Sequence, residues 1–349
     1  MAPQCPRRSP AAMPLRRRRF LALSGAGAGG ALLLASCGWT GRNKARRGPV
    51  IGMLQMVDAQ PPNLTRKGFE EALAAAGYRD GETVTFLRRD AAGLIPNTVA
   101  VMQQFLAETV DMVLAVGTPP LQAAMTVMPE DTPVVFCYCS DPWGVGAGVP
   151  PGGVGQHRPN VVGTVGTNPV GKELDLAREL NPALSSVGLI FNPDEPNSSY
   201  EARLLRQEAE RREITLVEQA VANAGQVPQA AKALAAKPVD AFVKIGDYAT
   251  IQAFAAICKV GLEHRIPVLS VDPPDIQLPG CLAVIGWNYR DDGLAAGQLA
   301  VRVLRGQSPA TLAFQSLTST DLLVNLSTAR AIGVNVPEAL LERADRVVR

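Results

Sequence analysis

The segment Asp111–Pro142 reads as strand, loop, helix, loop and strand. Its first strand, Met112–Val116, is a short apolar run that ends at the sequence Gly117-Thr118-Pro119-Pro120. Two prolines suit the first turn of a helix, where a missing N–H has no partner to lose. A second apolar run, Val134–Tyr138, follows that helix. Two strands joined through a helix form a βαβ unit, and this unit requires a parallel sheet.

Polar residues come directly after both strands of this unit. Thr118 follows the first strand, and Ser140 and Asp141 follow the second. Ligands bind at the carboxyl edge of open α/β sheets, so we expect Thr118 and Asp141 to form two sides of one site. A structural role remains open for each, because Thr118 could cap the helix and Asp141 could serve the turn before Pro142.

The same alternation of strands and helices extends along the chain and restarts after Val165. It predicts an α/β fold of two Rossmann-like lobes, with parallel sheets around a ligand cleft. Residues 49–165 and about 286–316 form the first predicted lobe, and residues 166–285 and about 317–349 form the second, with hinges near Val165 and Ile285. Outside the central unit, strands are expected at Val50–Met56, Thr83–Leu87, Val161–Val165, Ser186–Phe191, Thr215–Val221, Ala241–Ile245, Ile266–Ser270, Leu282–Ile285 and Leu322–Asn325, and helices at Asn63–Ala76, Ile95–Glu108, Gly171–Leu180, Ser199–Arg212, Val227–Lys237, Ala249–Val260, Asp291–Leu304 and Ser327–Ile332.

Polar residues also follow two strands of the second predicted lobe. Asn197 or Ser198 is expected to cap the next helix, whose free amides favour an anionic group such as a carboxylate. Asp247 follows a neighbouring strand and could take an ammonium group. The alternative for Asn197, Ser198 and Ser199 is a cap with no ligand.

Residues 1–36 are interpreted as an export signal. Arg17-Arg18 precedes Phe20-Leu21 and a short run of small and apolar residues, as in twin-arginine signals. Leu34-Ala35-Ser36-Cys37 resembles a bacterial lipobox, which would make Cys37 the lipidated N-terminus and residues 37–48 a tether; Met13 is an alternative start. An uncleaved anchor is the competing interpretation. The expected location is therefore the periplasmic or extracytoplasmic face of a membrane.

The charge of the remaining chain gives no support to nucleic-acid binding. The formal charge of +2 includes six arginines within residues 1–36. Without them the chain has 28 basic and 32 acidic residues, a net charge of −4. A basic patch of the kind that binds phosphate backbones is therefore not expected.

No motif predicts catalysis, a cofactor or a metal site. Gly166–Lys172 has the glycine and lysine spacing of a phosphate-binding loop, but Glu173 stands where Ser or Thr is needed, so a strand-to-helix crossover is expected. Neither His157 nor His264 belongs to a recognised nucleophile motif. Four cysteines are expected to be buried thiols, with one unassigned disulfide as the alternative: Cys137, Cys139, Cys258 and Cys281.

Several motifs in order resemble one family. VDMVLAVGTPPLQAA, TPVVFCYCSDPW, VGLIFNPDEPNSS, VDAFVKIGDYAT and LLVNLSTARAIGVNVP are similar to the TrpX-like substrate-binding lipoproteins of ABC importers, over residues 48–345. The resemblance implies a type I periplasmic-binding-protein fold, hinged closure on a small polar ligand such as an amino acid, and permease and ATPase partners. The alternatives are a sensing module for a membrane kinase or receptor and a secreted enzyme.

The resemblance also implies ligand-binding residues. Two positions and one loop depart from the usual family pattern. Ser140 replaces a usual threonine, Trp143 replaces a small aliphatic residue, and the loop Gly144–Arg158 is longer. These departures lie at the mouth of the expected cleft. The implied ligand-binding residues are Gln55, Met56, Thr118, Ser140 and Asp141 in the first lobe, and Asn197, Ser198, Ser199 and Asp247 in the second.

Overall fold

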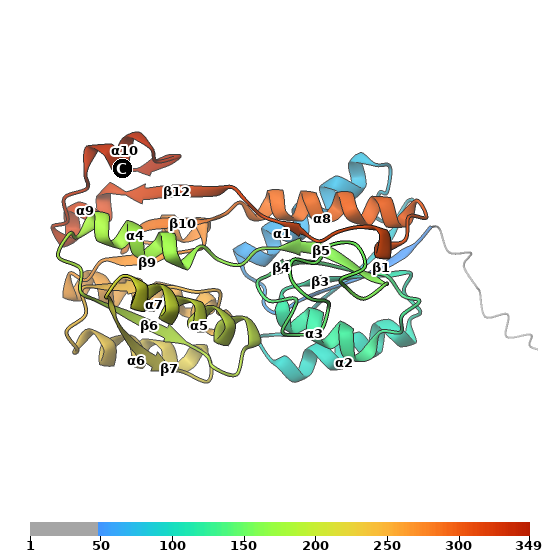
Figure 1. Cartoon of the computed structure of the whole chain (residues 1–349), viewed down its shortest axis with the longest axis horizontal. Coiled ribbons are helices and arrows are strands. Elements are labelled where there is room, and N and C mark those ends of the chain that lie inside the picture. Colours follow the sequence, from blue (N-terminus) through green and yellow to red (C-terminus); the bar gives the residue numbers. More distant parts are fainter. Residues whose placement is uncertain (1–47) are drawn as a thin grey trace, which may run out of the picture. The chain divides into compact units, whose positions relative to one another are not determined.

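The computed structural model describes residues 48–349. The predicted signal, the lipobox with Cys37 and nearly all of the tether lie outside the described residues. The described chain forms two lobes, each with one sheet and helices packed against it (Figure 1). Within residues 48–349, no helix combines the length and the apolar character needed to cross a membrane.

The first lobe contains a six-stranded sheet in the order β11-β5-β4-β3-β1-β2, in which all pairs are parallel. Every residue of β3 and β5 is buried, because helices cover both faces of a parallel sheet. The strands are β1 (Val50–Gln55), β2 (Thr85–Asp90), β3 (Met112–Val116), β4 (Val134–Cys139), β5 (Val161–Val165) and β11 (Gln315–Ser316), and the helices are α1 (Gln60–Ala75), α2 (Ile95–Ala107), α3 (Thr118–Val127) and α8 (Tyr289–Leu304).

The second lobe contains a seven-stranded sheet in the order β13-β12-β10-β9-β8-β6-β7, and only the β10–β12 pair is antiparallel. The strands are β6 (Ser186–Phe191), β7 (Thr215–Ala220), β8 (Ala241–Val243), β9 (Val268–Ser270), β10 (Cys281–Trp287), β12 (Thr320–Asn325) and β13 (Arg346–Val348). The helices are α4 (Val170–Leu180), α5 (Pro196–Arg211), α6 (Val227–Ala235), α7 (Tyr248–His264), α9 (Leu326–Ile332) and α10 (Glu338–Glu342), and short 3-10 turns lie at Ala224–Gln226, Pro273–Gln277 and Pro309–Thr311.

The chain passes between the two sheets at three places. β5 of the first lobe leads into α4 of the second, β10 of the second leads back into α8, and β11 leads into β12. The second passage is short, because Trp287 ends β10 and Tyr289 already begins α8, with Asn288 as the N-cap between them. Any relative movement of the lobes must be absorbed by the residues of these three passages.

Helices α1 and α8 pack side by side on the first sheet (Figure 1). Glycines make this close approach possible. A Cβ at Gly68 would meet the backbone carbonyl of Arg290, and a Cβ at Gly293 would meet that of Thr65. Because α8 follows directly from β10, this packing fixes the first lobe onto the chain segment that leaves the second.

Several predicted element bounds were wrong. α5 begins at Pro196 rather than Ser199, and its N-cap is Glu195, so Asn197 and Ser198 lie inside the first turn. The reason is Pro196, which the helix accepts at its first position because no partner exists there for the missing N–H. The short elements β11, α10 and β13 were not predicted.

The four cysteines of the described chain are free and buried, which confirms the expectation of buried thiols. Cys137 and Cys139 lie on β4, and Cys258 and Cys281 lie on α7 and β10. Burial raises the pKa of the Cys139 and Cys258 thiols to about 12. These thiols behave as small apolar core groups rather than as nucleophiles.

Candidate ligand-binding site

A small enclosed cavity lies between the lobes, where strand ends of both sheets meet. Its volume of about 20 Å³ is close to the space that one water molecule requires. The lining combines side chains from the first lobe, from the second lobe and from the crossover after β5. The lining residues are Tyr138, Ser140, Gly166, Asn168, Asn197, Glu201, Gly246, Asp247, Tyr248, Ile251 and Tyr289.

Glu201 supplies a buried carboxylate to this cavity. The side chain lies on α5 and is 1% exposed. Its Oε2 accepts from the Gly246 amide at 2.6 Å, and the Asn168 side-chain amide donates to both carboxylate oxygens at 3.1 and 3.0 Å. Burial raises the pKa of Glu201 to about 7, although the hydrogen bonds from Gly246 and Asn168 oppose the shift.

Two further oxygens around the cavity have no hydrogen-bond partner among the described residues: Asn168 Oδ1 and Asn197 Oδ1. The amide nitrogen of Asn197 donates to the Gly246 carbonyl at 2.7 Å, and that of Asn168 donates to Glu201, so both amides are fixed in orientation. Buried acceptors without donors are costly. With Glu201, they form a set of acceptors that suits a ligand rich in N–H donors.

Three tyrosines close the cavity. The Tyr138 ring lies edge-on to Tyr289, with ring centroids 5.0 Å apart, and its centroid is 6.3 Å from that of Tyr248. Tyr138 and Tyr289 belong to first-lobe elements and Tyr248 begins α7 of the second lobe. The site therefore combines aromatic walls with buried acceptors, and no lysine or arginine is among its lining residues.

Asp292 holds Tyr138 in an unusual backbone conformation. Tyr138 has a positive φ of 53°, which few non-glycine residues adopt, and the β4–β5 pairing shifts register at this point. The Tyr138 amide donates to Asp292 Oδ2 at 2.8 Å, and the Thr164 hydroxyl donates to Asp292 Oδ1. Asp292 is 1% exposed, and burial raises its pKa to about 6.

Three of the residues predicted from the sequence line the cavity: Ser140, Asn197 and Asp247. Asp247 already has protein partners at both oxygens. Oδ1 accepts from the Thr250 amide at 2.6 Å, and Oδ2 accepts from the Asn192 amide at 2.6 Å and from the Ser198 hydroxyl at 2.8 Å. The carboxylate thus caps α7 and joins it to the loop after β6.

The other predicted residues lie outside the lining. Thr118 Oγ1 is 3.4 Å from Cys139 Sγ, and the Gly144 amide donates to Asp141 Oδ1 at 2.8 Å, as in a turn. The Ser199 hydroxyl donates to the Pro193 carbonyl at 2.6 Å. Gln55 donates to the Val57 carbonyl at 2.9 Å, and Met56 is fully buried. A ligand contact for these residues, or for Ser198, stays a prediction.

Sequence reasoning missed Tyr138, Asn168 and Glu201 as cavity residues. Two weak signals were present. Asn168 lies in the crossover that resembles a phosphate-binding loop, and Glu201 follows Asn197 by four positions, which places both side chains on one face of α5.

The comparisons with known proteins identify the family. Residues 50–348 match the family model described as ABC transporter substrate binding protein. This match covers nearly all of the described chain. The protein therefore belongs to the ABC transporter substrate-binding protein family, whose members bind small ligands.

Individual relatives agree with this assignment. A tyrosine-binding protein of Clostridioides difficile (strain R20291) is 28% identical over 332 residues, covering 91% of this chain and 93% of that protein. A conserved domain protein from Vibrio cholerae has 27% identity and a TM-score of 0.81, over 86% of this chain and 99% of that structure. An ABC domain from Streptococcus pneumonia, solved with L-Trp, has 24% identity and a TM-score of 0.80, and the match covers 86% of this chain and 100% of that structure. At this identity, the similarity concerns the fold alone.

Proposed function

We propose that this protein is the extracytoplasmic receptor of an ABC importer and that its ligand is a free aromatic amino acid. In this account the chain is exported, anchored by lipid at Cys37, and delivers its ligand to permease and ATPase subunits. Family membership supports the receptor role. The relative named a tyrosine-binding protein supports an aromatic ligand. No catalytic step is required.

One observation carries the choice of an amine-bearing ligand. The Glu201 carboxylate is buried beside unpartnered acceptors of Asn168 and Asn197, and no cationic side chain lines the cavity. An α-ammonium group would supply three donors and one positive charge to this set. Charge-assisted hydrogen bonds of this kind are among the strongest available to a ligand. Glu201, rather than Asp247, is therefore the proposed partner of the amine.

The carboxylate and the aromatic side chain of the proposed ligand also have suitable partners in the site. The first turn of α5, with Asn197 and Ser198, is the proposed partner of the carboxylate, because helix N-termini favour anionic groups. Tyr138 and Tyr248 are the proposed walls around the aromatic side chain, since ring pairs add to the burial of apolar area.

Binding requires movement in this account. A volume of about 20 Å³ is far below that of any amino acid. The ligand must therefore enter when the lobes separate and be enclosed as they close, with hinges at the passages from β5 to α4, from β10 to α8 and from β11 to β12.

Native mass spectrometry of residues 38–349 purified from cells, followed by denaturing release of co-purified molecules, tests the proposal. We expect an aromatic amino acid, unchanged and at one per chain. A sugar, a nucleoside or a metal ion in its place would contradict the assignment of Glu201. A chemically altered product appearing during incubation would contradict the absence of catalysis.

A further inference from the structure

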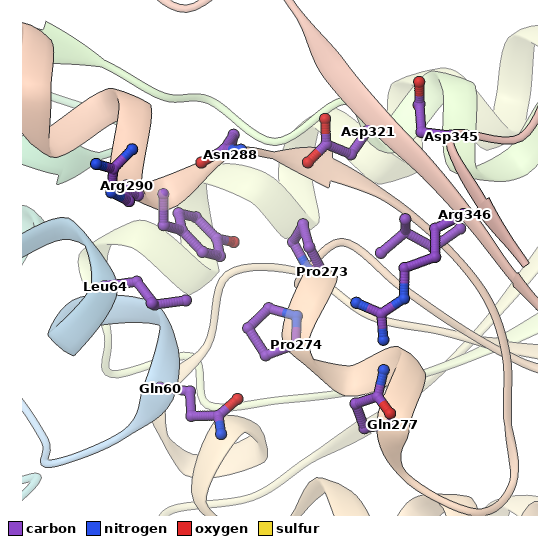
Figure 2. A pocket seen from close by; sticks show the side chains of 12 residues that line it. Gln60, Leu64, Pro273, Pro274, Gln277, Asn288, Arg290, Asp321, Asp345 and Arg346 are labelled. Carbon is purple, nitrogen blue, oxygen red and sulfur yellow. The ribbon is translucent and has the colours of Figure 1, made fainter. Parts of the chain in front are cut away.

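A second and larger pocket adjoins the enclosed cavity. Its volume is about 610 Å³, and it lies between α1 and α8 of the first lobe and the Pro273–Gln277 turn, β12 and β13 of the second (Figure 2). This volume is enough for a small organic molecule. The lining residues are Gln60, Leu64, Pro273, Pro274, Gln277, Asn288, Tyr289, Arg290, Asp321, Leu323, Asp345 and Arg346.

Tyr289 is the one residue that lines both this pocket and the enclosed cavity. It is the first residue of α8 and is 4% exposed. A residue common to two linings forms part of the wall between them. The tyrosine side chain therefore separates a space of about 20 Å³ from one of about 610 Å³.

Contacts with the second lobe hold this wall in place. The Tyr289 hydroxyl donates to Asp272 Oδ1 and lies 3.4 Å from the Val271 carbonyl. On its other side the ring packs edge-on against Tyr138. Tyr289 is thus fixed both by its hydroxyl and by its ring.

Asp272 is itself held firmly. Its Oδ2 lies 2.5 Å from Lys244 Nζ, and Lys244 Nζ also lies 2.6 Å from Asp275 Oδ2. The side chains of Lys244 and Asp272 are 2% and 0% exposed. A buried ion pair restrains its partners, because moving one charge away would leave the other unpaired. The acceptor of the Tyr289 hydroxyl therefore has little freedom to move.

The larger pocket has the character of a site for an extended ligand. Leu64, Pro273, Pro274 and Leu323 give it apolar walls. The Arg346 side chain extends toward Gln277 (Figure 2), and its guanidinium makes no ion pair or hydrogen bond within residues 48–349. A guanidinium beside a carboxamide suits the carboxylate of a ligand.

We infer that Tyr289 determines specificity by confining the ligand to a single free amino acid, and that it excludes peptides extended at their carboxyl end. This inference rests on the proposed function. With its ammonium at Glu201, a dipeptide would have to pass the Tyr289 ring to place its carboxylate near Arg346. Removing the ring would join the two spaces and admit such a ligand.

Calorimetric titration with L-tyrosine and with L-tyrosylglycine tests the inference. We expect the wild-type protein to prefer the amino acid at least 100-fold. Tyr289→Ala should gain dipeptide affinity at least tenfold over wild type, whereas Tyr289→Phe, which keeps the ring, should not. Tyr78→Ala, a tyrosine of the first lobe outside both linings, is the matched control and should keep the wild-type preference.

Two results would overturn the inference. One is wild-type protein that binds the dipeptide as tightly as the amino acid. The other is a folded Tyr289→Ala that binds L-tyrosine but still rejects the dipeptide. Adding Arg346→Gln to Tyr289→Ala should remove the gained dipeptide affinity and leave L-tyrosine binding unchanged; an unchanged dipeptide affinity would contradict the proposed path.

Ligand-independent readouts separate this inference from the proposed function. If the wild-type protein binds neither compound, the proposed function fails. The role of Tyr289 as a wall is then tested by the crystal structure of Tyr289→Ala. One continuous cavity would support this role, and two separate cavities would overturn it.

The thermal midpoints of Tyr289→Phe, Asp272→Asn and the double variant provide a second test. Non-additive shifts support the hydroxyl contact, and additive shifts contradict it.

Discussion

The hydroxyl of Tyr248, on the second lobe, lies against Gly117 of the first lobe, 2.0 Å from the point that a Cβ would occupy. Gly117 is the N-cap of α3 and has a φ of 114°. The absence of a side chain therefore serves two purposes, since it permits the backbone conformation and leaves room for a residue of the opposite lobe.

Gly117→Ala should weaken ligand binding at least about tenfold, or about 1.4 kcal/mol, because the added methyl group would keep Tyr248 from its closed position. Calorimetric titration measures the change. Gly81→Ala is the control, because Gly81 also has a positive φ of 77° but no atom within 4 Å of the added carbon. Both variants should lose some stability, but only Gly117→Ala should lose affinity. Adding Tyr248→Phe should restore part of the affinity, and a failure to do so would contradict the contact.

Ligand affinity should rise with pH and level off above about pH 8. The pKa of Glu201 is about 7, so the free protein carries a protonated, neutral carboxyl at pH 5.5 and an ionised one at pH 8. An ammonium ligand favours the ionised form, so each unit of pH below 7 should weaken binding up to about tenfold. Titrations at a series of pH values measure the effect.

Glu201→Gln should bind weakly at every pH, with a nearly flat profile. Glu173→Gln is the matched control. Glu173 is also fully buried with a pKa of about 8, but it accepts from the Lys244 amide at 3.0 Å and does not line the cavity. This control should keep the wild-type dependence. If Glu201→Gln keeps the same dependence too, another group must bind the amine.

Asp292→Asn should change how stability depends on pH. The Asp292 pKa is about 6 in the folded protein and about 3.9 in an unfolded chain. Between these values the folded state binds more protons, so the carboxyl lowers stability as pH rises, and the effect is nearly complete above about pH 7. The wild-type free energy of unfolding, relative to Asp292→Asn, should therefore fall by about 2 kcal/mol from pH 4 to pH 7.

Urea unfolding at each pH measures this difference. Asp291→Asn, an exposed neighbour on α8, is the control and should follow the wild-type profile. Because Asp292 holds the Tyr138 amide, Asp292→Asn should also weaken ligand binding. Full affinity in the variant would show that the Tyr138 conformation does not depend on this carboxylate.

Gly293→Ala should destabilise the first lobe, although glycine to alanine within a helix ordinarily stabilises by about 1 kcal/mol. The added carbon would meet the Thr65 carbonyl of α1, and overpacking at a close contact costs about 1–3 kcal/mol. Gly171→Ala in α4 is the control, because its new carbon would meet the flexible side chain of Glu208 at 3.0 Å. Thermal unfolding should therefore show opposite signs for the two variants. Stabilisation by Gly293→Ala would contradict the close packing of α1 and α8.

The order of strands and helices could be predicted from the sequence, because apolar runs and their proline or glycine ends are local signals. Met112–Val116 and Ser186–Phe191 have the predicted bounds. β11 and β13 are two and three residues long and form only by pairing with β5 and β12. No local pattern distinguishes such segments from loops.

The site was less predictable, since burial depends on residues far apart in the chain. Glu201 reads as an ordinary polar residue of an amphipathic helix, yet Gly246 and Asn168, separated from it by 45 and 33 positions, enclose its carboxylate. Asp247 follows a strand as expected of a ligand residue, but its oxygens satisfy backbone amides and Ser198 instead. Strand-end position indicated the correct edge of each sheet without showing which side chains face the cavity.

Calorimetric titration of residues 48–349 with L-tyrosine, L-tryptophan and 3-(4-hydroxyphenyl)propionate, the tyrosine analogue without the amino group, is the most direct test of the central claim. We predict one-to-one binding of at least one of the amino acids and at least 100-fold weaker binding of the analogue, because the analogue brings no charge to Glu201. Equal affinity for L-tyrosine and its analogue, or binding of neither amino acid, would contradict the account.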